Sequence, residues 1–423
     1  MLISLVIPTR ERAELLGPCL DAALAIDDPG LEIVVSDNAS ADGTAELVSS
    51  LTDSRLRYVN TGQRVSMRQN FETALAAATG EYVIFIGDDD GIYTGGLALL
   101  RDVIERERPE AVSWDLVHYT WPSTRPGHEC GFINIKAQNV FGGIRHKPAP
   151  RLLDDFCQAR IRNYKDGANI YHGCISRDLI ETVRNANGGT YFGGAIPDVY
   201  ACIANLAHLR SDLLWLRHPV TFGGASDRSN GAAQTGAAKA PASGAAETRR
   251  FVREAGVDRD AAGIDLAVPS LDALTLDMLE VFNRSAGNGV LPIDRAAWLD
   301  RIMRRLSRMP RPKYDRGFAA LAAYCERMGT ESLFETANGH HPFSGSDEVS
   351  AGARPVRSRV SPLKITLAHP SALASVRDAA DALQEVLGDD HRCRAMGLSR
   401  WARWLRAIRR AAWLVRGWKT TGI

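Results

Sequence analysis

The sequence predicts an α/β fold in which a mostly parallel sheet is covered by helices on both faces. Over residues 1–120, short apolar runs rich in β-branched residues alternate with longer segments whose apolar residues recur at helical spacing. The short runs are apolar at consecutive positions, which is typical of strands buried on both faces. Strands that alternate with helices pair in parallel, because each helix carries the chain back across the sheet.

The elements follow one another in a regular order along this part of the chain. Strands are expected at residues 2–7, 31–35, 55–59, 81–86 and 111–118. Helices are expected at residues 12–26, from 42 onward, at 66–79 and at 95–106. Ser66 is expected to cap the third helix, because a serine hydroxyl accepts a hydrogen bond from a free N–H of the first turn.

Beyond residue 120 the alternation stops, and regions of different composition follow. We assign residues 1–222 to one α/β domain. Residues 223–246 are almost free of large apolar side chains, so they are predicted to form a mobile loop. The remaining regions are predicted to be a helical extension at 247–338, a polar linker at 339–362 and a basic, Trp-rich amphipathic segment at 363–423.

The overall composition excludes several classes of protein. The 51 Lys and Arg residues nearly balance the 50 Asp and Glu residues, which gives no reason to expect nucleic-acid binding. The seven cysteines include no C-x-x-C pair, which argues against a zinc ribbon or a disulfide scaffold. The N-terminus does not resemble a signal peptide, and no run approaches the roughly 20 apolar residues of a transmembrane helix. We therefore expect a cytoplasmic protein.

Polar clusters follow three of the expected strands, at the point where each strand ends. They are residues 8–10, residues 37–38 and the triplet Asp88-Asp89-Asp90. Open parallel sheets bind ligands outside the carboxyl ends of their strands. The three clusters are therefore expected to meet at one rim of the sheet and to form one site.

The Asp triplet is the most informative of these clusters. Three adjacent carboxylates repel one another, and Mg²⁺ or Mn²⁺ takes carboxylate oxygens while leaving positions open for phosphate oxygens. In an extended turn, Asp88 and Asp90 point the same way. The alternative is a solvated acidic turn that caps the next helix, but the position at the end of a buried strand favours the metal site.

Four segments of the first hundred residues, taken together and in order, carry a resemblance to a known family. They read VIPTRER at 6–12, IVVSDNASADGT at 33–44, QNFETAL at 69–75 and GEYVIFIGDDD at 80–90. This stretch resembles a family 2 glycosyltransferase with the GT-A fold. The resemblance extends to about residue 222 and is absent after residue 250.

The resemblance implies roles for individual residues. Those expected to bind a nucleotide-sugar donor are Pro8, Thr9, Arg10, Arg12, Asp37, Arg68, Asn70, Asp88 and Asp89. Asp90 is expected to bind the Mn²⁺ or Mg²⁺ that bridges the donor's two phosphates. One departure is that Gly87 stands where many members of the family carry another aspartate.

The family inverts the anomeric centre by direct displacement, for which a carboxylate must accept the proton of the acceptor hydroxyl. The resemblance places this base after a Gly-rich turn and ahead of a helix. The segment GGTYFGGAIPD at 188–198 fits that description, so Asp198 is the expected base. Many members have Glu-Asp there, whereas Pro197 precedes Asp198 in this chain. The alternative role for Asp198 is a first-turn acid that stabilises the helix.

Four further residues are weaker candidates for the acceptor or for a lid over the donor. His172 and Arg177 lie between the two acidic segments, although a lone histidine is more often structural. Ser226 and Ser229 belong to the predicted loop, which is of the kind that folds over a donor and excludes water. The loop is equally compatible with a plain linker.

The C-terminal segment is basic and aromatic, with no acidic residue from 391 to 423. On a helical wheel, one face is expected to hold Trp401, Trp404, Leu405, Ile408, Ala412 and Val415. Arg403, Arg406 and Arg410 are expected on the opposite face. This pattern in residues 398–419 favours a helix in an anionic membrane surface, at the inner face of the cell membrane. The alternatives are packing on the protein itself or on a partner.

The sequence thus favours a metal-dependent transferase that moves a sugar from a nucleotide-diphosphate donor to a hydroxyl of a surface glycan or a lipid-linked acceptor. A nucleotidyltransferase would need a Gly-rich basic loop after the first strand, and residues 8–12 contain no glycine. A sugar-nucleotide-binding scaffold without turnover is the alternative outside enzymes. The intact Asp88-x-Asp90 pair and the available Asp198 count against it.

Overall fold

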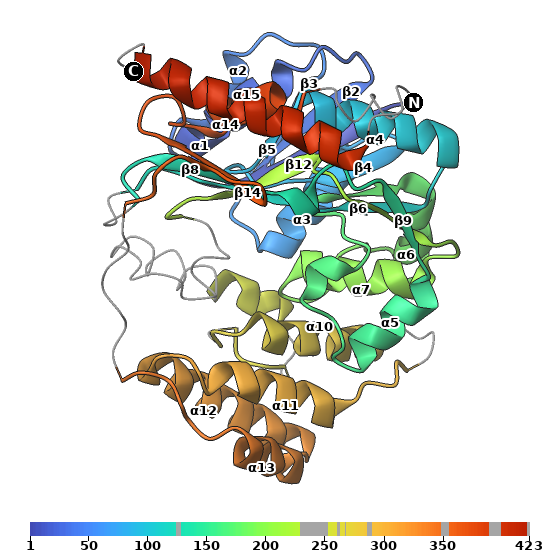
Figure 1. Ribbon diagram of the computed structural model, residues 1–423. Helices are drawn as coiled ribbons and strands as arrows, with labels where there is room; N and C mark the ends of the chain where they lie inside the picture. The colour runs from blue at the N-terminus through green and yellow to red at the C-terminus, as the bar shows by residue number, and fades with distance from the viewer. Residues whose placement is uncertain are drawn as a thin grey trace.

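The computed structural model describes most of the chain and places two sheets above a group of helices (Figure 1). The described residues are 1–123, 128–228, 253–259, 263–266, 268–285, 290–347, 355–388 and 399–420. The C-terminal helix lies at the top of this view, and the helices of the extension lie at the bottom. The expected α/β fold is confirmed.

The larger sheet has eight strands in the order β3-β2-β1-β4-β10-β6-β11-β9. Their bounds are β1 Ile3–Thr9, β2 Leu31–Asp37, β3 Leu56–Asn60, β4 Tyr82–Phe85, β6 Ala111–Trp114, β9 Ile144–Lys147, β10 Gly173–Ser176 and β11 Leu213–Leu216. The first four strands in this order are parallel, as expected. The sheet as a whole is mixed, because β10 and β9 run antiparallel to their neighbours.

Side chains of the larger sheet point alternately to two hydrophobic cores. In β1, Leu5 and Ile7 contribute to one core, and Val6 between them contributes to the other. In β4, Ile84 and Phe85 divide in the same way. Period-two alternation between two buried faces explains why these strands are apolar at consecutive positions.

The helices beside this sheet are α1 Ala13–Leu24, α2 Thr44–Ser49, α3 Met67–Ala77, α4 Thr94–Glu107, α5 Ala149–Cys157, α6 Arg177–Ala186 and α7 Pro197–His208. The first four of them match the helices expected from the sequence closely. Ser66 caps α3 as expected, accepting a hydrogen bond from the Gln69 N–H in a complete capping box. Short 3₁₀ turns lie at η1 Ala137–Asn139, η2 Tyr164–Asp166 and η3 Gly256–Asp258.

The smaller sheet joins distant parts of the chain in the order β13-β14-β8-β7-β12-β5. Its strands are β5 Gly91–Ile92, β7 Val117–Thr120, β8 Gly131–Lys136, β12 Thr221–Ala225, β13 Arg359–Val360 and β14 Lys364–His369. The single strand expected at 111–118 is wrong. The strand is interrupted after Trp114. As a result, β6 belongs to the larger sheet and β7 to the smaller one.

The helical extension packs beneath the larger sheet. Its long helices are α10 Leu271–Ser285, α11 Arg295–Leu306, α12 Arg311–Met328 and α13 Glu331–His340. Trp298 and Leu279 of the extension share one hydrophobic core with Val6 and Phe85 of the sheet. The extension is therefore continuous with the α/β part and not a separately packed unit.

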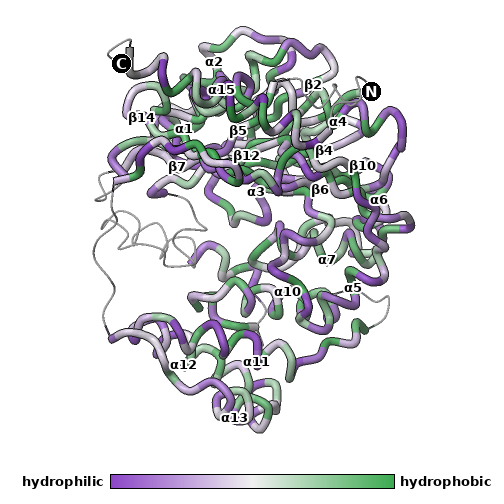
Figure 2. Tube along the Cα trace, viewed as in Figure 1, coloured by the Kyte–Doolittle hydropathy of each residue, from purple (hydrophilic) through white to green (hydrophobic). Residues whose placement is uncertain are grey.

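The C-terminal segment is built into the opposite side of the molecule. Strand β14 pairs with β8, and helices α14 Val376–Leu387 and α15 Arg400–Thr420 cover the second core. Hydrophobic and hydrophilic residues alternate along α15 (Figure 2). Among the described residues, none of the helices combines the length and apolar character of a bilayer-spanning segment.

The helical wheel expected for the C-terminal helix needs correction. Trp404 is buried against the body of the protein, whereas Trp401 is 60% exposed and Leu405 is 51% exposed. Arg403, expected on the polar face, is buried and donates a hydrogen bond to the Phe141 carbonyl. The helix docks through Trp404 together with small alanines, which allow a close approach to α14 and β14.

Candidate active site

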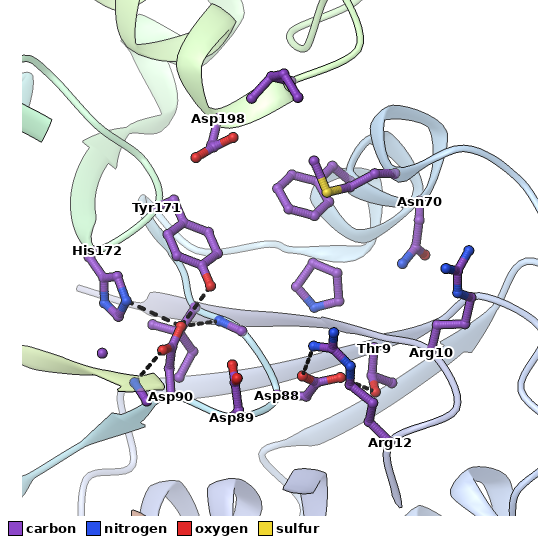
Figure 3. A pocket seen from close by; sticks show the side chains of 18 of the residues that line it. Thr9, Arg10, Arg12, Asn70, Asp88, Asp89, Asp90, Tyr171, His172 and Asp198 are labelled. Atoms are coloured by element: carbon purple, nitrogen blue, oxygen red, sulfur yellow. Dashed lines mark hydrogen bonds and ion pairs between the residues drawn. The ribbon is translucent and has the colours of Figure 1, made fainter. Parts of the chain in front are cut away.

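A pocket of about 420 Å³ opens at the carboxyl ends of β1 and β4. This volume lies within the range of small-molecule sites. The sheet side of the pocket carries Pro8, Thr9, Arg10, Arg12 and the Asp triplet, as expected. The opposite wall comes from η2, the start of α7 and the start of α10. Figure 3 shows Asp198 across the pocket from Asp88, Asp89 and Asp90.

Asp88 is anchored by two residues that follow β1. Its carboxylate accepts hydrogen bonds from the Thr9 hydroxyl at 2.7 Å and from Arg12 Nη1 at 3.0 Å. Burial alone would lower the pKa of Arg12, but the charges of Asp88 and Asp89 raise it above its usual value. The TRER segment after the first strand thus fixes the orientation of the first aspartate of the triplet.

Asp90 accepts hydrogen bonds from three directions. Its Oδ2 receives the Tyr171 hydroxyl and the Gly87 N–H, both at 2.7 Å, and its Oδ1 receives the Gly224 N–H at 2.7 Å. The His172 Nε2 lies 3.2 Å from Oδ2 (Figure 3). Burial opposes ionisation, but His172 and the hydrogen-bond donors hold the pKa of Asp90 well below its usual range.

Asp89 ties the triplet to β12. Its carboxylate accepts the Ser226 hydroxyl at 2.7 Å, and its carbonyl accepts the Trp121 indole N–H at 2.9 Å. A Cβ at Gly224 would overlap the Asp89 carbonyl oxygen, so only glycine permits this close approach. Ser226, expected in a lid, therefore supports the acidic turn directly.

The donor atoms at this end suit a divalent cation. Carboxylates of the triplet and the imidazole of His172 face the pocket together. Within the described residues, no group of three acidic, His or Cys side chains converges as a complete metal site. Mg²⁺ is commonly held by only one or two carboxylates, with phosphate oxygens and water as its other ligands. The carboxylates of the triplet are compatible with such a shared site.

Asp198 occupies the first turn of α7 and faces the pocket. Its Oδ2 accepts the hydroxyl of Tyr164 at 2.8 Å. Burial raises the pKa of Asp198, while the Tyr164 hydrogen bond and the charge of Lys165 act in the opposite direction. A carboxylate with a raised pKa, held at the mouth of a pocket, is suited to accept a proton.

Three residues expected at the site are placed elsewhere. Asp37 is buried outside the pocket lining and accepts hydrogen bonds from Tyr58 and Asn60. Arg68 pairs with Asp258 at 2.6 Å. Arg177 donates to the carbonyls of residues 78 and 80. Asn70 does line the pocket, while Ser229 lies outside the described residues.

The pocket lining also includes residues that the sequence did not mark as part of a site. Tyr164 and Lys165 come from η2, and Glu254 and Leu271 come from the extension. Glu254 forms an ion pair with Arg10, which closes the pocket near β1. No local motif marks these positions, and they lie far along the chain from the Asp triplet.

Comparison with known proteins decides the family of the α/β part. Residues 4–169 match the model of "Glycosyl transferase family 2". These residues are a family 2 glycosyltransferase domain. The match begins in β1 and includes the Asp triplet, so the resemblance carried by the four segments is confirmed.

Curated glycosyltransferases are similar to the same part of the chain. The chain is 35% identical over 101 residues to the GalNAc(5)-diNAcBac-PP-undecaprenol beta-1,3-glucosyltransferase of Campylobacter jejuni, covering 23% of this chain and 33% of that protein. It is 31% identical over 112 residues to the abequosyltransferase RfbV of Salmonella typhimurium, covering 25% and 34%. The chain thus spans about a third of the length of these relatives.

Solved structures give a broader but weaker likeness. The structure of residues 1–349 of S. aureus TarS aligns over 80% of this chain and 90% of its own, with 14% identity and a TM-score of 0.44. Asp198 lies beyond the end of the matched glycosyltransferase domain at residue 169. The role of Asp198 therefore depends on its position in the pocket.

Proposed function

We propose that the protein is an inverting glycosyltransferase that moves a sugar from a nucleotide-diphosphate donor to a hydroxyl of a surface glycan or a lipid-linked acceptor. The observation that carries this proposal is the arrangement of acids across one pocket. The acidic turn Asp88-Asp89-Asp90 lies on one side of the pocket, and Asp198, the residue proposed as the base, lies on the other. Direct displacement needs such opposed groups, because base and leaving group act on opposite faces of the anomeric carbon.

At the sheet side, the chain's own residues position the donor. Pro8, Thr9 and Arg10 line the end of the pocket beside β1, and the triplet lies where the diphosphate would be held. Asp90 would hold Mn²⁺ or Mg²⁺, which when bound would offset the negative charge on the departing diphosphate. The buried hydrogen bonds of Asp88 and Asp90 fix both carboxylates before the donor arrives.

At the opposite side, Asp198 would accept the proton of the acceptor hydroxyl as that oxygen attacks the sugar. The Tyr164 hydroxyl donates to one carboxylate oxygen of Asp198, Oδ2, and so fixes the orientation of the carboxylate. Apolar side chains of Phe71 and Leu271 line the same region, which helps to exclude water from the reaction.

Donor turnover tests this proposal. The purified protein is incubated with a panel of UDP-, GDP- and dTDP-sugars with and without Mn²⁺, and the released nucleoside diphosphate is measured. We expect release with one class of donor, a loss of at least tenfold in Asp90→Ala, and a loss of 10²-fold or more in Asp198→Asn. Binding without release would favour a scaffold, and release of pyrophosphate from a nucleoside triphosphate would favour a nucleotidyltransferase.

We also propose that the outward face of α15 contacts an anionic membrane surface. This face carries Trp401, Leu405 and Trp413, which are 51–66% exposed. Exposed Arg406, Arg409 and Arg416 lie on the same side of the helix. Exposed tryptophans beside arginines are typical of helices that lie in a membrane interface. A lipid-linked acceptor would be presented at such a surface.

Vesicle sedimentation tests the membrane contact. We expect the protein to bind vesicles that contain about a third phosphatidylserine and to release them in high salt, because attraction to anionic lipid is screened. The double substitution Trp401→Gln and Trp413→Gln should weaken binding. Val290→Gln is a control, since Val290 is 80% exposed on the extension. Equal binding by both variants would contradict the assignment of this face.

A further inference from the structure

The short turn η2 brings two functional groups to the proposed base. The hydroxyl of Tyr164 donates to Asp198 Oδ2 at 2.8 Å, and the next residue, Lys165, lines the same pocket and interacts electrostatically with both Asp198 and Asp90. The turn is fixed by Asn163, whose side chain accepts a hydrogen bond from the Lys165 N–H. Tyr164 is itself anchored, since its carbonyl accepts the Cys202 thiol of α7.

We propose that Tyr164 and Lys165 are positioning residues that keep Asp198 ionised and correctly oriented as the base. The proposal rests on the function proposed above, since it explains how a carboxylate buried at that place stays able to accept a proton. Tyr164 acts by hydrogen bonding to the charged form, and Lys165 acts by its positive charge.

Among the described residues, Lys165 is the charged side chain that acts most strongly on Asp198. Helices α3 and α10 line the same pocket with the apolar Met67, Phe71 and Leu271 and with the uncharged Asn70. On its own helix, Cys202 is a buried thiol whose pKa burial raises well above the usual value, so it stays neutral.

The remaining acid of η2 has a partner of its own. Asp166 forms an ion pair with Arg162 at 2.6 Å and accepts that residue's main-chain N–H. Burial lowers the pKa of Lys165, and the charges of Asp90 and Asp198 act in the opposite direction. The positive charge of Lys165 therefore interacts with acids on both sides of the pocket.

The pH profile of kcat/KM tests the proposal, with the donor that the full-length protein turns over. Activity should rise with pH as Asp198 ionises. In Tyr164→Phe and Lys165→Met the carboxylate is harder to ionise, so the rise should move to higher pH. On this acid limb we expect kcat/KM about three- to tenfold below wild type, with most of the loss recovered at higher pH. Lys165→Arg should restore the wild-type profile.

Tyr200→Phe is the matched control, because this tyrosine lies on α7 and its hydroxyl contacts Ser285 instead of Asp198. Its profile should keep the wild-type midpoint. A uniform loss at all pH values in Tyr164→Phe and Lys165→Met, with unchanged midpoints, would show a merely structural role and overturn the proposal.

A second readout separates this proposal from the proposed function. In protein labelled with ¹³C at the aspartate carboxyl carbon, the Asp198 resonance is the one absent from Asp198→Asn. Its titration midpoint should rise in Tyr164→Phe and in Lys165→Met, and equal midpoints in all variants would overturn the proposal. The midpoints could rise while Asp198→Asn turns over donor at the wild-type rate. In that case the effect of Tyr164 and Lys165 on the ionisation of Asp198 is supported, but Asp198 is not the base.

Discussion

Arg12 and Asp88 form a largely buried ion pair at the floor of the pocket. The Asp88 side chain is 3% exposed and the Arg12 side chain is 16% exposed. Arg12→Met should destabilise the fold by about 3 kcal/mol, because it leaves a buried charge without its cation. Arg64→Met removes a more exposed pair with Glu11 and should cost less than about 1 kcal/mol. Urea unfolding measures the loss of stability in both variants. Equal losses would contradict a larger contribution from the Arg12–Asp88 pair.

A second prediction at the residue scale concerns the effect of Asp198 on the stability of the fold. Burial raises its folded-state pKa above the unfolded value, so its ionisation costs folding free energy above the folded pKa. Below the unfolded pKa the carboxyl is protonated in both states and the cost vanishes. Asp198→Asn should therefore melt at a higher temperature than wild type at pH 7, and at an equal temperature near about pH 3.

Asp178 provides the control for this stability measurement. It is an exposed acid in the first turn of α6, a place equivalent to that of Asp198 in α7. Asp178→Asn should give no gain in melting temperature at pH 7, since an exposed acid at a helix N-terminus is favourable. A gain in that variant alone would contradict the account of Asp198.

The sequence predicted the residues of the site where a local pattern marks them. Thr9, Arg12 and the Asp triplet follow strands and belong to recognisable segments, and all line the pocket. Tyr164 and Lys165 carry no such signal, because their role depends on the packing of η2 against α7. The contacts of Asp37 with Tyr58 and Asn60 could not be predicted either, since they depend on which strand lies beside β2.

At the scale of elements, β12 and the acidic turn depend on each other. Gly224 donates its N–H to Asp90 and lies against the Asp89 carbonyl. Gly224→Ala should push the strand away, cost about 1–3 kcal/mol of stability and weaken donor binding. Gly339→Ala in α13 is the control, because nothing lies within 4 Å of its added Cβ, and it should stabilise by about 0.5–1 kcal/mol. Similar effects of both substitutions on donor affinity would contradict this dependence.

The sequence could not predict where neighbouring segments pack against different parts of the fold. The chain from 111 to 120 is continuously rich in strand-forming residues, yet β6 and β7 pair in different sheets. In α15 the large apolar residues suggested one face, but Ala407 and Ala411 are buried with Trp404 and set the packed side. Small residues decide how closely a helix can dock, and a pattern of large side chains does not show this.

At the scale of the whole molecule, the N-terminal strands and the C-terminal segment share one hydrophobic core. Strand β14 pairs with β8 along residues 364–369, and Trp404, Leu383 and Leu367 are buried in the core above the larger sheet. A chain that ends at residue 362 should lose this core and expose β8 as an edge. We expect low soluble yield and no cooperative melting. A truncated chain that melts like the full-length protein would show that residues 363–423 are dispensable.

The extension also belongs to the site and not only to the architecture. Glu254 and Leu271 line the pocket, and α10 packs on α7 beside Asp198. The helical pattern of this region was predicted, but its function was not, because a contact such as the one between Glu254 and Arg10 spans 244 residues of sequence.

The most direct test of the account is the configuration of the sugar that the enzyme first releases. With an α-linked donor and water as acceptor, early time points of ¹H NMR distinguish the two anomers before they equilibrate. A base at Asp198, opposite the diphosphate at the Asp triplet, predicts that the β anomer forms first. The α anomer as first product would contradict direct displacement and the role of Asp198.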